Sequence, residues 1–273
     1  MSFTLKGRLV LVGAGKMGGA MLEGWLRAGL AADRVVILDP SPPPEIASLL
    51  DRHGIARNPA IDSIADAEIV LIAVKPQIID DVLPTVAPLR SSKPLILSVA
   101  AGKTIATFER YFGKDAAVIR SIPNTPAAVG RGITAMAANA NVSLRQLAHA
   151  KSLLSAVGEV VTVPDESQID AVTAVSGSGP AYVFYLTECL AAAGARMGLA
   201  PDLAMQLARA TVAGAGELMR VTGADAATLR QNVTSPKGTT YAALQVLMAQ
   251  DGLPRLMDEA VEAATRRSRE LAS

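Results

Sequence analysis

The sequence predicts an α/β domain followed by an all-helical domain. In the first part of the chain, short β-branched and apolar segments alternate with longer amphipathic ones, a pattern typical of a parallel sheet with helices on both faces. From Ile169 onward, almost every segment has helical periodicity and is rich in Ala, Leu and Met. The change of pattern indicates two domains.

The expected strands of the first domain cover residues 8–12, 35–38, 69–74, 94–99 and 117–122, followed by 132–138 and 159–163. The run 69–74 is apolar throughout, so we expect it to be buried on both faces, in the middle of the sheet. Pro164 and the polar residues after it mark the expected boundary, with residues 1–164 in the first domain and 165–273 in the second.

The expected helices of the second domain are interrupted at residues 176–180, 198–201, 223, 235–238 and 252–254. Segments such as 191–195 and 210–216 are apolar or small around much of the helix, which is more surface than a domain of this size can bury alone. We therefore expect a homo-oligomer formed through this domain. A tight intramolecular bundle is the alternative.

The composition narrows the class of protein. Half of the 273 residues are hydrophobic, and the net charge of +1 favours neither nucleic acid nor a membrane surface as a partner. We find no leader and no membrane-spanning run, so we expect a cytoplasmic protein. Cys189 is the single cysteine, which excludes an intramolecular disulfide and thiolate clusters; we expect it to be buried. We expect His53 and His149 to face solvent and to bind no metal.

A glycine motif stands between the first expected strand and the first expected helix. Residues 13–18, GAGKMG, fit G-x-G-x-x-G: Gly13 permits a tight turn, Gly15 lets the backbone approach a pyrophosphate, and Gly18 allows the helix to pack closely. Glycines also serve ordinary turns, but this context predicts a Rossmann dinucleotide-binding domain.

Asp39 ends the second expected strand, where a carboxylate accepts hydrogen bonds from an adenosine ribose and repels a 2′-phosphate. This favours NADH over NADPH. Asp39 is also the first residue of the turn Asp39-Pro40-Ser41-Pro42. This role in the turn does not exclude a contact with the ribose.

Four motifs resemble those of the pyrroline-5-carboxylate reductase family. They are residues 73–77 (AVKPQ), 121–126 with the core PNTP, 176–182 (SGSGPAY) and 232–240 (NVTSPKGTT). Each could occur by chance, but the four stand in order and at the family's spacing over nearly the whole chain.

The resemblance implies reduction of 1-pyrroline-5-carboxylate to L-proline with NADH or NADPH, the last step of proline biosynthesis. It also implies an N-terminal Rossmann domain and a C-terminal helical dimerisation domain that exchanges helices in a homodimer, often stacked into a ring of dimers. In this family the cofactor of one subunit meets the helical domain of its partner.

The family's binding residues carry over to matching positions of this sequence. The resemblance implies contacts with the cofactor from Val12, Gly13, Ala14, Gly15, Lys16, Met17, Ser41, Ala73, Val74, Lys75, Pro76, Val99, Ala100, Ala101 and Asn232. It implies contacts with the substrate or product from Glu166, Thr239 and Thr240.

The last motif also has a physical interpretation. A helix that begins after Pro236-Lys237-Gly238 presents free N–H groups and the positive end of its dipole, beside the hydroxyls of Ser235, Thr239 and Thr240. This predicts a carboxylate receptor, although an ordinary helix cap has the same residues. Two positions depart from the family: Lys237 stands where a glycine is usual, and Asp39 where many members have a small residue.

Reduction of a protonated imine depends mainly on positioning, so we expect no essential Lys, His or Cys. Thr240 is the candidate that hydrogen-bonds the substrate nitrogen and relays a proton, and Lys75 is expected to contribute its backbone only. The alternatives are a β-hydroxyacid dehydrogenase or imine reductase relative, which would use a lysine in a helix of the second domain, and a regulatory module that senses the cofactor without turnover.

Overall fold

A computed structural model describes residues 5–272 and divides the chain into two units. The first unit runs up to Gly177 and also includes the end of the chain from Thr265; the second is Ser178–Ala264. The expected boundary at Pro164 falls within the first unit, in the loop after its last strand.

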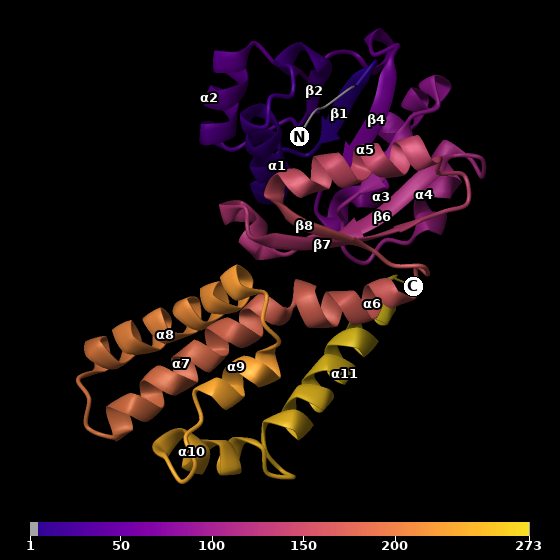
Figure 1. Ribbon diagram of the computed structural model, residues 1–273. Coiled ribbons are helices and arrows are strands. Elements are labelled where there is room, and N and C mark those ends of the chain that lie inside the picture. Colours follow the sequence, from indigo (N-terminus) through magenta and orange to yellow (C-terminus); the bar gives the residue numbers. More distant parts are fainter. Residues whose placement is uncertain (1–4, 273) are drawn as a thin grey trace. The chain divides into compact units, whose positions relative to one another are not determined.

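The first unit is built on an eight-stranded sheet (Figure 1), in the order β3-β2-β1-β4-β5-β6-β7-β8. The strands are β1 (Arg8–Val12), β2 (Val35–Leu38), β3 (Ala56–Arg57), β4 (Ala67–Ile72), β5 (Leu95–Ser98), β6 (Ala117–Ile122), β7 (Gly132–Ala138) and β8 (Gly158–Thr162). The seven expected strands are confirmed to within two residues at each end, and β4 lies centrally. The two-residue β3 was not predicted.

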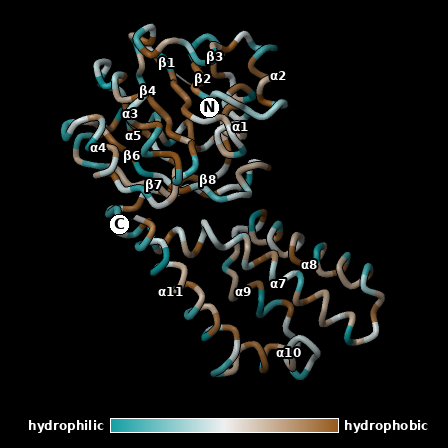
Figure 2. Tube along the Cα trace, turned by 180° about the vertical axis from the view of Figure 1, so that it is seen from behind, coloured by the Kyte–Doolittle hydropathy of each residue, from teal (hydrophilic) through white to brown (hydrophobic). Residues whose placement is uncertain are grey.

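Helices cover both faces of this sheet. Alternate residues of β1 point to opposite faces: Leu9 and Leu11 pack in a core with α1 (Lys16–Arg27), α2 (Pro44–His53) and α5 (Leu144–Leu154). Val10 and Val12 pack in a second core with α3 (Ile79–Val86) and α4 (Ile105–Phe112). Figure 2 shows these strands as a hydrophobic centre. The doubly wound arrangement predicted from the sequence is confirmed.

One strand departs from the expected parallel sheet. β7 runs antiparallel to β6, whereas all other pairs are parallel. Only residues 123–131 join β6 to β7, and their 3-10 turn (Thr125–Val129) does not provide the crossover that a parallel pair needs. The chain therefore turns back beside β6.

The second unit is helical, as predicted. Its helices are α7 (Gly179–Arg196), α8 (Pro201–Thr222), α9 (Ala226–Asn232), α10 (Thr239–Leu247) and most of α11 (Leu253–Ala272), and α6 (Gln168–Val172) precedes it in the first unit. α7 and α8 pack through small residues: Ala191, Ala204 and Ala208 are buried, and a Cβ on Gly194 would lie 3.5 Å from that of Ala204.

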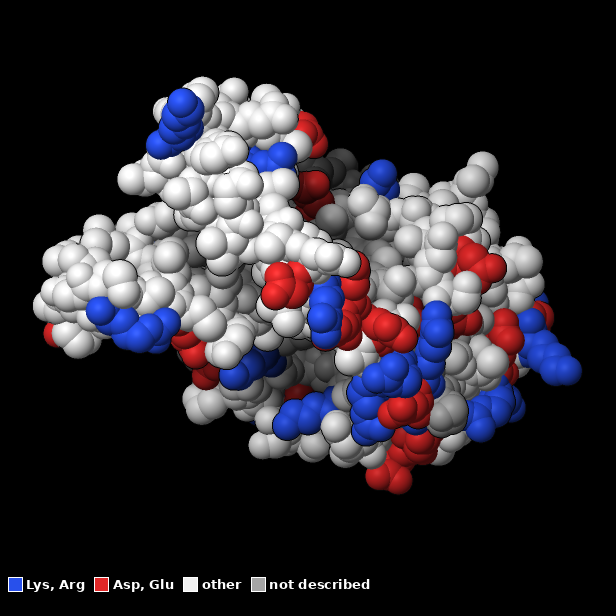
Figure 3. Space-filling view, turned by 90° about the horizontal axis from the view of Figure 1, so that it is seen from below, with Lys and Arg blue, Asp and Glu red and all other residues white. Residues whose placement is uncertain are grey.

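Many large apolar side chains of this unit are exposed, among them Phe184, Leu186, Leu190, Leu207 and Val246. Figure 3 shows broad uncharged areas on the face viewed from below. None of the described helices combines the length and the apolarity needed to cross a membrane. The exposed apolar surface is what an oligomerisation domain requires.

Candidate active site

The ends of four parallel strands are held side by side at one edge of the sheet. Just beyond the strands, three backbone N–H groups donate to carbonyl oxygens at the ends of neighbouring strands, at 2.8–3.0 Å: Gly13 to Leu38, Ala73 to Val12 and Val99 to Ile72. These bonds align the loops after β2, β1, β4 and β5. The edge therefore brings together the expected cofactor residues of the first unit: Val12, Gly13, Ala14, Gly15, Lys16, Met17, Asp39, Ser41, Ala73, Val74, Lys75, Pro76, Val99, Ala100 and Ala101.

The three glycines of the first loop have the geometry expected of them. Gly13 has a φ of +90°, and a Cβ on Gly18 would lie 2.1 Å from the Gly13 carbonyl oxygen, so α1 could not pack on the loop with any side chain there. A Cβ on Gly15 meets nothing within 4 Å. Gly15 is also the N-cap of α1, whose first turn has no acidic residue and no side-chain cap. The open space at Gly15 fits a pyrophosphate on the helix N-terminus.

Asp39 holds the glycine loop to the end of β2. Its Oδ2 accepts from the Ala14 N–H at 2.7 Å, and its Oδ1 accepts from the Ser41 N–H at 2.8 Å. The second bond confirms the turn predicted from the sequence. A carboxylate has further lone pairs, so these bonds leave room for a ribose hydroxyl, and that role stays a prediction.

Asn58 was missed by sequence reasoning. It follows β3 with a φ of +48°, its Oδ1 accepts from the Asp39 N–H at 2.8 Å, and its Nδ2 donates to the Asp39 carbonyl at 2.7 Å. Asn58 thus fixes the backbone of Asp39. An Asn directly after a two-residue strand is a weak signal, because β3 itself could not be predicted.

In the second unit, the expected substrate residues gather at the start of α10. A turn joins them, in which the Gly238 N–H donates to the Ser235 carbonyl at 3.0 Å, and Gly238 is the N-cap of α10. No side chain caps this helix and no acid lies in its first turn. Its first N–H groups are thus available to an anion, beside Thr239 and Thr240. Asn232 is the last residue of α9, shortly before this turn.

Lys237 adopts a left-handed conformation, with a φ of +61°. This explains in physical terms why a glycine suits the position, since a Cβ is strained there. Its side chain is exposed, beside the N-terminus of α10.

Glu166 lies in the first unit and is held by two donors. Its Oε1 accepts from the N–H of Ile105, the first residue of α4, at 2.8 Å and from Arg120 Nη1 at 3.1 Å. The Glu166 side chain is 28% exposed. At the neighbouring Asp165, hydrogen bonds from the backbone and side chain of Ser167 lower the pKa of the carboxyl group.

Two expectations about single residues were wrong. Cys189 is exposed, because the face of α7 that carries it is not covered by the described residues; its hydrogen bond raises the pKa of Tyr185. His149 is partly buried, with a side chain 16% exposed and its Nδ1 3.5 Å from Glu68 Oε1. His53 is exposed, as expected.

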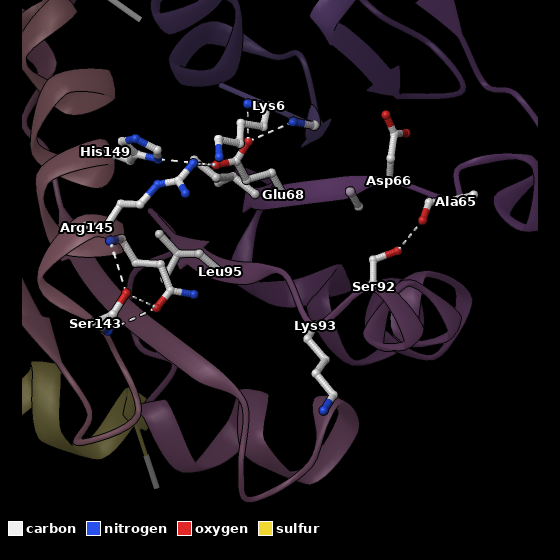
Figure 4. Close-up of a pocket in the computed structure, with 14 residues that line it drawn as sticks. Lys6, Ala65, Asp66, Glu68, Ser92, Lys93, Leu95, Ser143, Arg145 and His149 are labelled. Carbon is white, nitrogen blue, oxygen red and sulfur yellow. Dashed lines mark hydrogen bonds and ion pairs between the residues drawn. The ribbon is translucent and has the colours of Figure 1, made fainter. Parts of the chain in front are cut away.

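His149 belongs to a cavity of about 520 Å³ at the opposite edge of the sheet, where β4 and β5 begin (Figure 4). Several polar groups of this cavity bind one another. Glu68 accepts from the backbone N–H groups of Lys6 and Gly7 and pairs with Arg145 at 3.0 Å. This cluster ties the amino-terminal segment to β4 and α5, and it lies away from the strand ends where a dinucleotide is expected.

Comparison with known proteins identifies the family. Residues 166–271 match the family described as pyrroline-5-carboxylate reductase dimerisation, and residues 8–102 match the family described as NADP oxidoreductase, coenzyme F420-dependent. A pyrroline-5-carboxylate reductase of Pseudomonas aeruginosa is 40% identical over 272 residues, which cover 97% of each protein. The chain belongs to the pyrroline-5-carboxylate reductase family.

Solved structures of the family agree with the fold. A pyrroline-5-carboxylate reductase from Coxiella burnetii has a TM-score of 0.91 at 33% identity and covers 98% of this chain and 100% of its own. A pyrroline carboxylate reductase from Plasmodium falciparum, solved with NADP bound, has a TM-score of 0.81 at 28% identity and covers 98% and 99%.

Family membership confirms the fold class and the activity predicted from the sequence. The chain is an oxidoreductase that reduces 1-pyrroline-5-carboxylate to L-proline with NADH or NADPH, and its helical part is a dimerisation domain of this family.

Proposed function

We propose that this chain holds NADH on the loops at the carboxyl ends of β1, β2, β4 and β5, and the carboxylate of 1-pyrroline-5-carboxylate at the start of α10. The observation that supports this most strongly is the open space at Gly15, where a Cβ would meet nothing within 4 Å, at a helix N-terminus that has neither a side-chain cap nor an acid in its first turn. The N-terminus at Gly238 also has neither. One suits a pyrophosphate and the other a carboxylate.

The residues of the first site fit a dinucleotide. Gly15 leaves space that a Cβ would fill, and the loops around Ala73 and Val99 continue the same edge. When bound, the nicotinamide supplies the hydride that reduces the C=N bond. Asp39 favours NADH, because its carboxylate would repel a 2′-phosphate.

In the second site, backbone N–H groups of residues 239–241 and the hydroxyls of Ser235 and Thr239 hold the carboxylate. The Thr240 hydroxyl hydrogen-bonds the ring nitrogen and relays the proton that this nitrogen carries during reduction. Glu166 contacts the substrate and Asn232 the cofactor, as the family resemblance implies. No lysine, histidine or cysteine is required for the chemistry.

The two sites belong to different subunits in this proposal. The match of residues 166–271 to a dimerisation family and the exposed apolar side chains of α7 and α8 support a homodimer. We extend the proposal to a ring of dimers and to a cytoplasmic location, the latter supported by a sequence with only one cysteine.

Thr240→Ala tests the proton relay, with Thr240→Ser as its matched control. Loss of one preorganised hydrogen bond costs about 3 kcal/mol, so turnover should fall roughly a hundredfold in Thr240→Ala. Thr240→Ser should recover much of it, and the NADH dissociation constant should stay near that of the wild type in both. Unchanged turnover in Thr240→Ala would refute the relay and leave this loop as a carboxylate receptor.

A further inference from the structure

A buried arginine lies in the second half of β6. Arg120 pairs in register with Ser98, the last residue of β5, and its side chain is only 4% exposed. The next residues of the chain after Ser98 are Val99, Ala100 and Ala101, three of the expected cofactor contacts. Arg120 is thus a buried cation on the strand beside β5, whose following loop carries these expected contacts.

Arg120 contacts two acids from the segment that follows the sheet. Its Nη1 is 3.1 Å from Glu166 Oε1, and its Nη2 is 3.7 Å from Asp170 Oδ1. A buried guanidinium keeps its charge and requires such partners, and its planar shape lets one side chain hold two carboxylates at a fixed separation.

The two acids are held from the other side as well. The Ile105 N–H donates to the same Oε1 of Glu166 at 2.8 Å, and the Ser268 hydroxyl donates to Asp170 Oδ1 at 2.7 Å. Ser268 lies near the end of α11, 98 residues along the chain from Asp170. A Cβ on Gly102, in the loop after β5, would lie 3.3 Å from Leu271 Cβ, so the last turns of α11 also lie against that loop.

The two oxygens of Glu166 consequently differ. Oε1 accepts two hydrogen bonds, whereas within residues 5–272 no donor contacts Oε2. A carboxylate held by one oxygen presents the other in a fixed direction, which is what a group that binds a protonated ring nitrogen needs.

We propose that Arg120 is a positioning residue for the reaction: through Glu166 Oε1 it orients Glu166 Oε2 toward the substrate, while Asp170 and Ser268 hold Arg120 and the end of α11 in place. This rests on the proposed contact of Glu166 with the substrate. Arg120 itself touches neither the substrate nor the cofactor.

The test is a double-mutant cycle of Arg120→Lys and Glu166→Gln, with pyrroline-5-carboxylate and NADH. Lysine keeps the charge but cannot bridge two carboxylates, and glutamine keeps an acceptor for Arg120 while weakening the contact with a cationic nitrogen. Each single variant should lower kcat/KM about tenfold or more, mainly through KM, with an unchanged NADH dissociation constant. The double variant should be no worse than Glu166→Gln alone, because Arg120 acts through Glu166.

Arg145→Lys is the matched control, since Arg145 pairs with Glu68 in the same unit at the other end of the strands. It should leave kcat/KM unchanged. If Arg120→Lys fails to fold, Asp170→Asn replaces it and should raise KM in the same way, with the same absence of an added effect in the Glu166→Gln background.

Multiplicative losses in the double variant would overturn the proposal, as would a folded Arg120→Lys or Asp170→Asn enzyme with the KM of the wild type. A wild type that does not oxidise NADH with pyrroline-5-carboxylate is a different result, because it would overturn the proposed function itself.

Discussion

Alanine substitutions at two glycines of the motif after β1, Gly15 and Gly18, should distinguish an effect on stability from an effect on cofactor binding. A Cβ at Gly18 would lie 2.1 Å from the Gly13 carbonyl oxygen, so Gly18→Ala must push α1 away from the loop. Overpacking of this kind costs about 1–3 kcal/mol, or roughly 2–10 °C in the melting temperature of a protein of this size. Stability and NADH affinity should therefore fall together.

A Cβ at Gly15 meets nothing within 4 Å, and the extended backbone there suits alanine. Gly15→Ala should cost no more than about 1 kcal/mol, from the poorer N-cap alone. The methyl group would nevertheless fill the space proposed for the pyrophosphate, so NADH affinity should fall at least about tenfold. Thermal melts and titration of NADH fluorescence measure the two quantities. A Gly15→Ala protein that binds NADH like the wild type would refute this placement of the cofactor.

Three further outcomes follow from the structure. Asp39→Ser should raise kcat/KM with NADPH relative to kcat/KM with NADH. Both cofactors should bind more weakly, because the hydrogen bond from the Ala14 N–H is lost. A wild type that already prefers NADPH about tenfold would contradict the contact of Asp39 with the ribose. Lys237→Gly should stabilise the protein by about 0.5–1 kcal/mol and so raise its melting temperature, because glycine adopts a φ of +61° without strain. A lower melting temperature would show that the lysine side chain stabilises the loop. Val183→Asp, on α7, should shift the protein toward monomers in light scattering, whereas the control Val161→Asp, on β8, should not. Both valines are 44% exposed. The reverse result would place the interface on the sheet domain.

The strands and the glycine loop could be predicted because their signals are local. An apolar run such as residues 69–74 is sufficient to indicate a buried strand, and the roles of Gly13 and Gly18 depend on neighbours a few residues away. The direction of β7 was missed because it depends on the length of a connection rather than on a periodicity. β3 was missed because two residues carry no pattern.

The missed positioning residues depend on contacts between distant parts of the chain. A charged residue inside the apolar strand 117–122 could have marked Arg120 as a buried cation that needs partners. Its partner Glu166 is 46 residues away, and Ser268 joins from the end of the chain. The prediction for Cys189 failed for a different reason. The apolar helix that carries it was expected to be buried within one chain, but Cys189 is exposed on the single chain.

The most direct test of the assigned activity is the reaction itself, measured with the purified protein. With 1-pyrroline-5-carboxylate and NADH, we expect one L-proline, resolved from D-proline by chiral chromatography, for each NADH oxidised. We also expect the Gly15→Ala and Thr240→Ala variants to have lower activity for different reasons, the first through NADH affinity and the second through turnover. NADH oxidation without formation of L-proline, or no oxidation of either NADH or NADPH, would contradict the assigned activity.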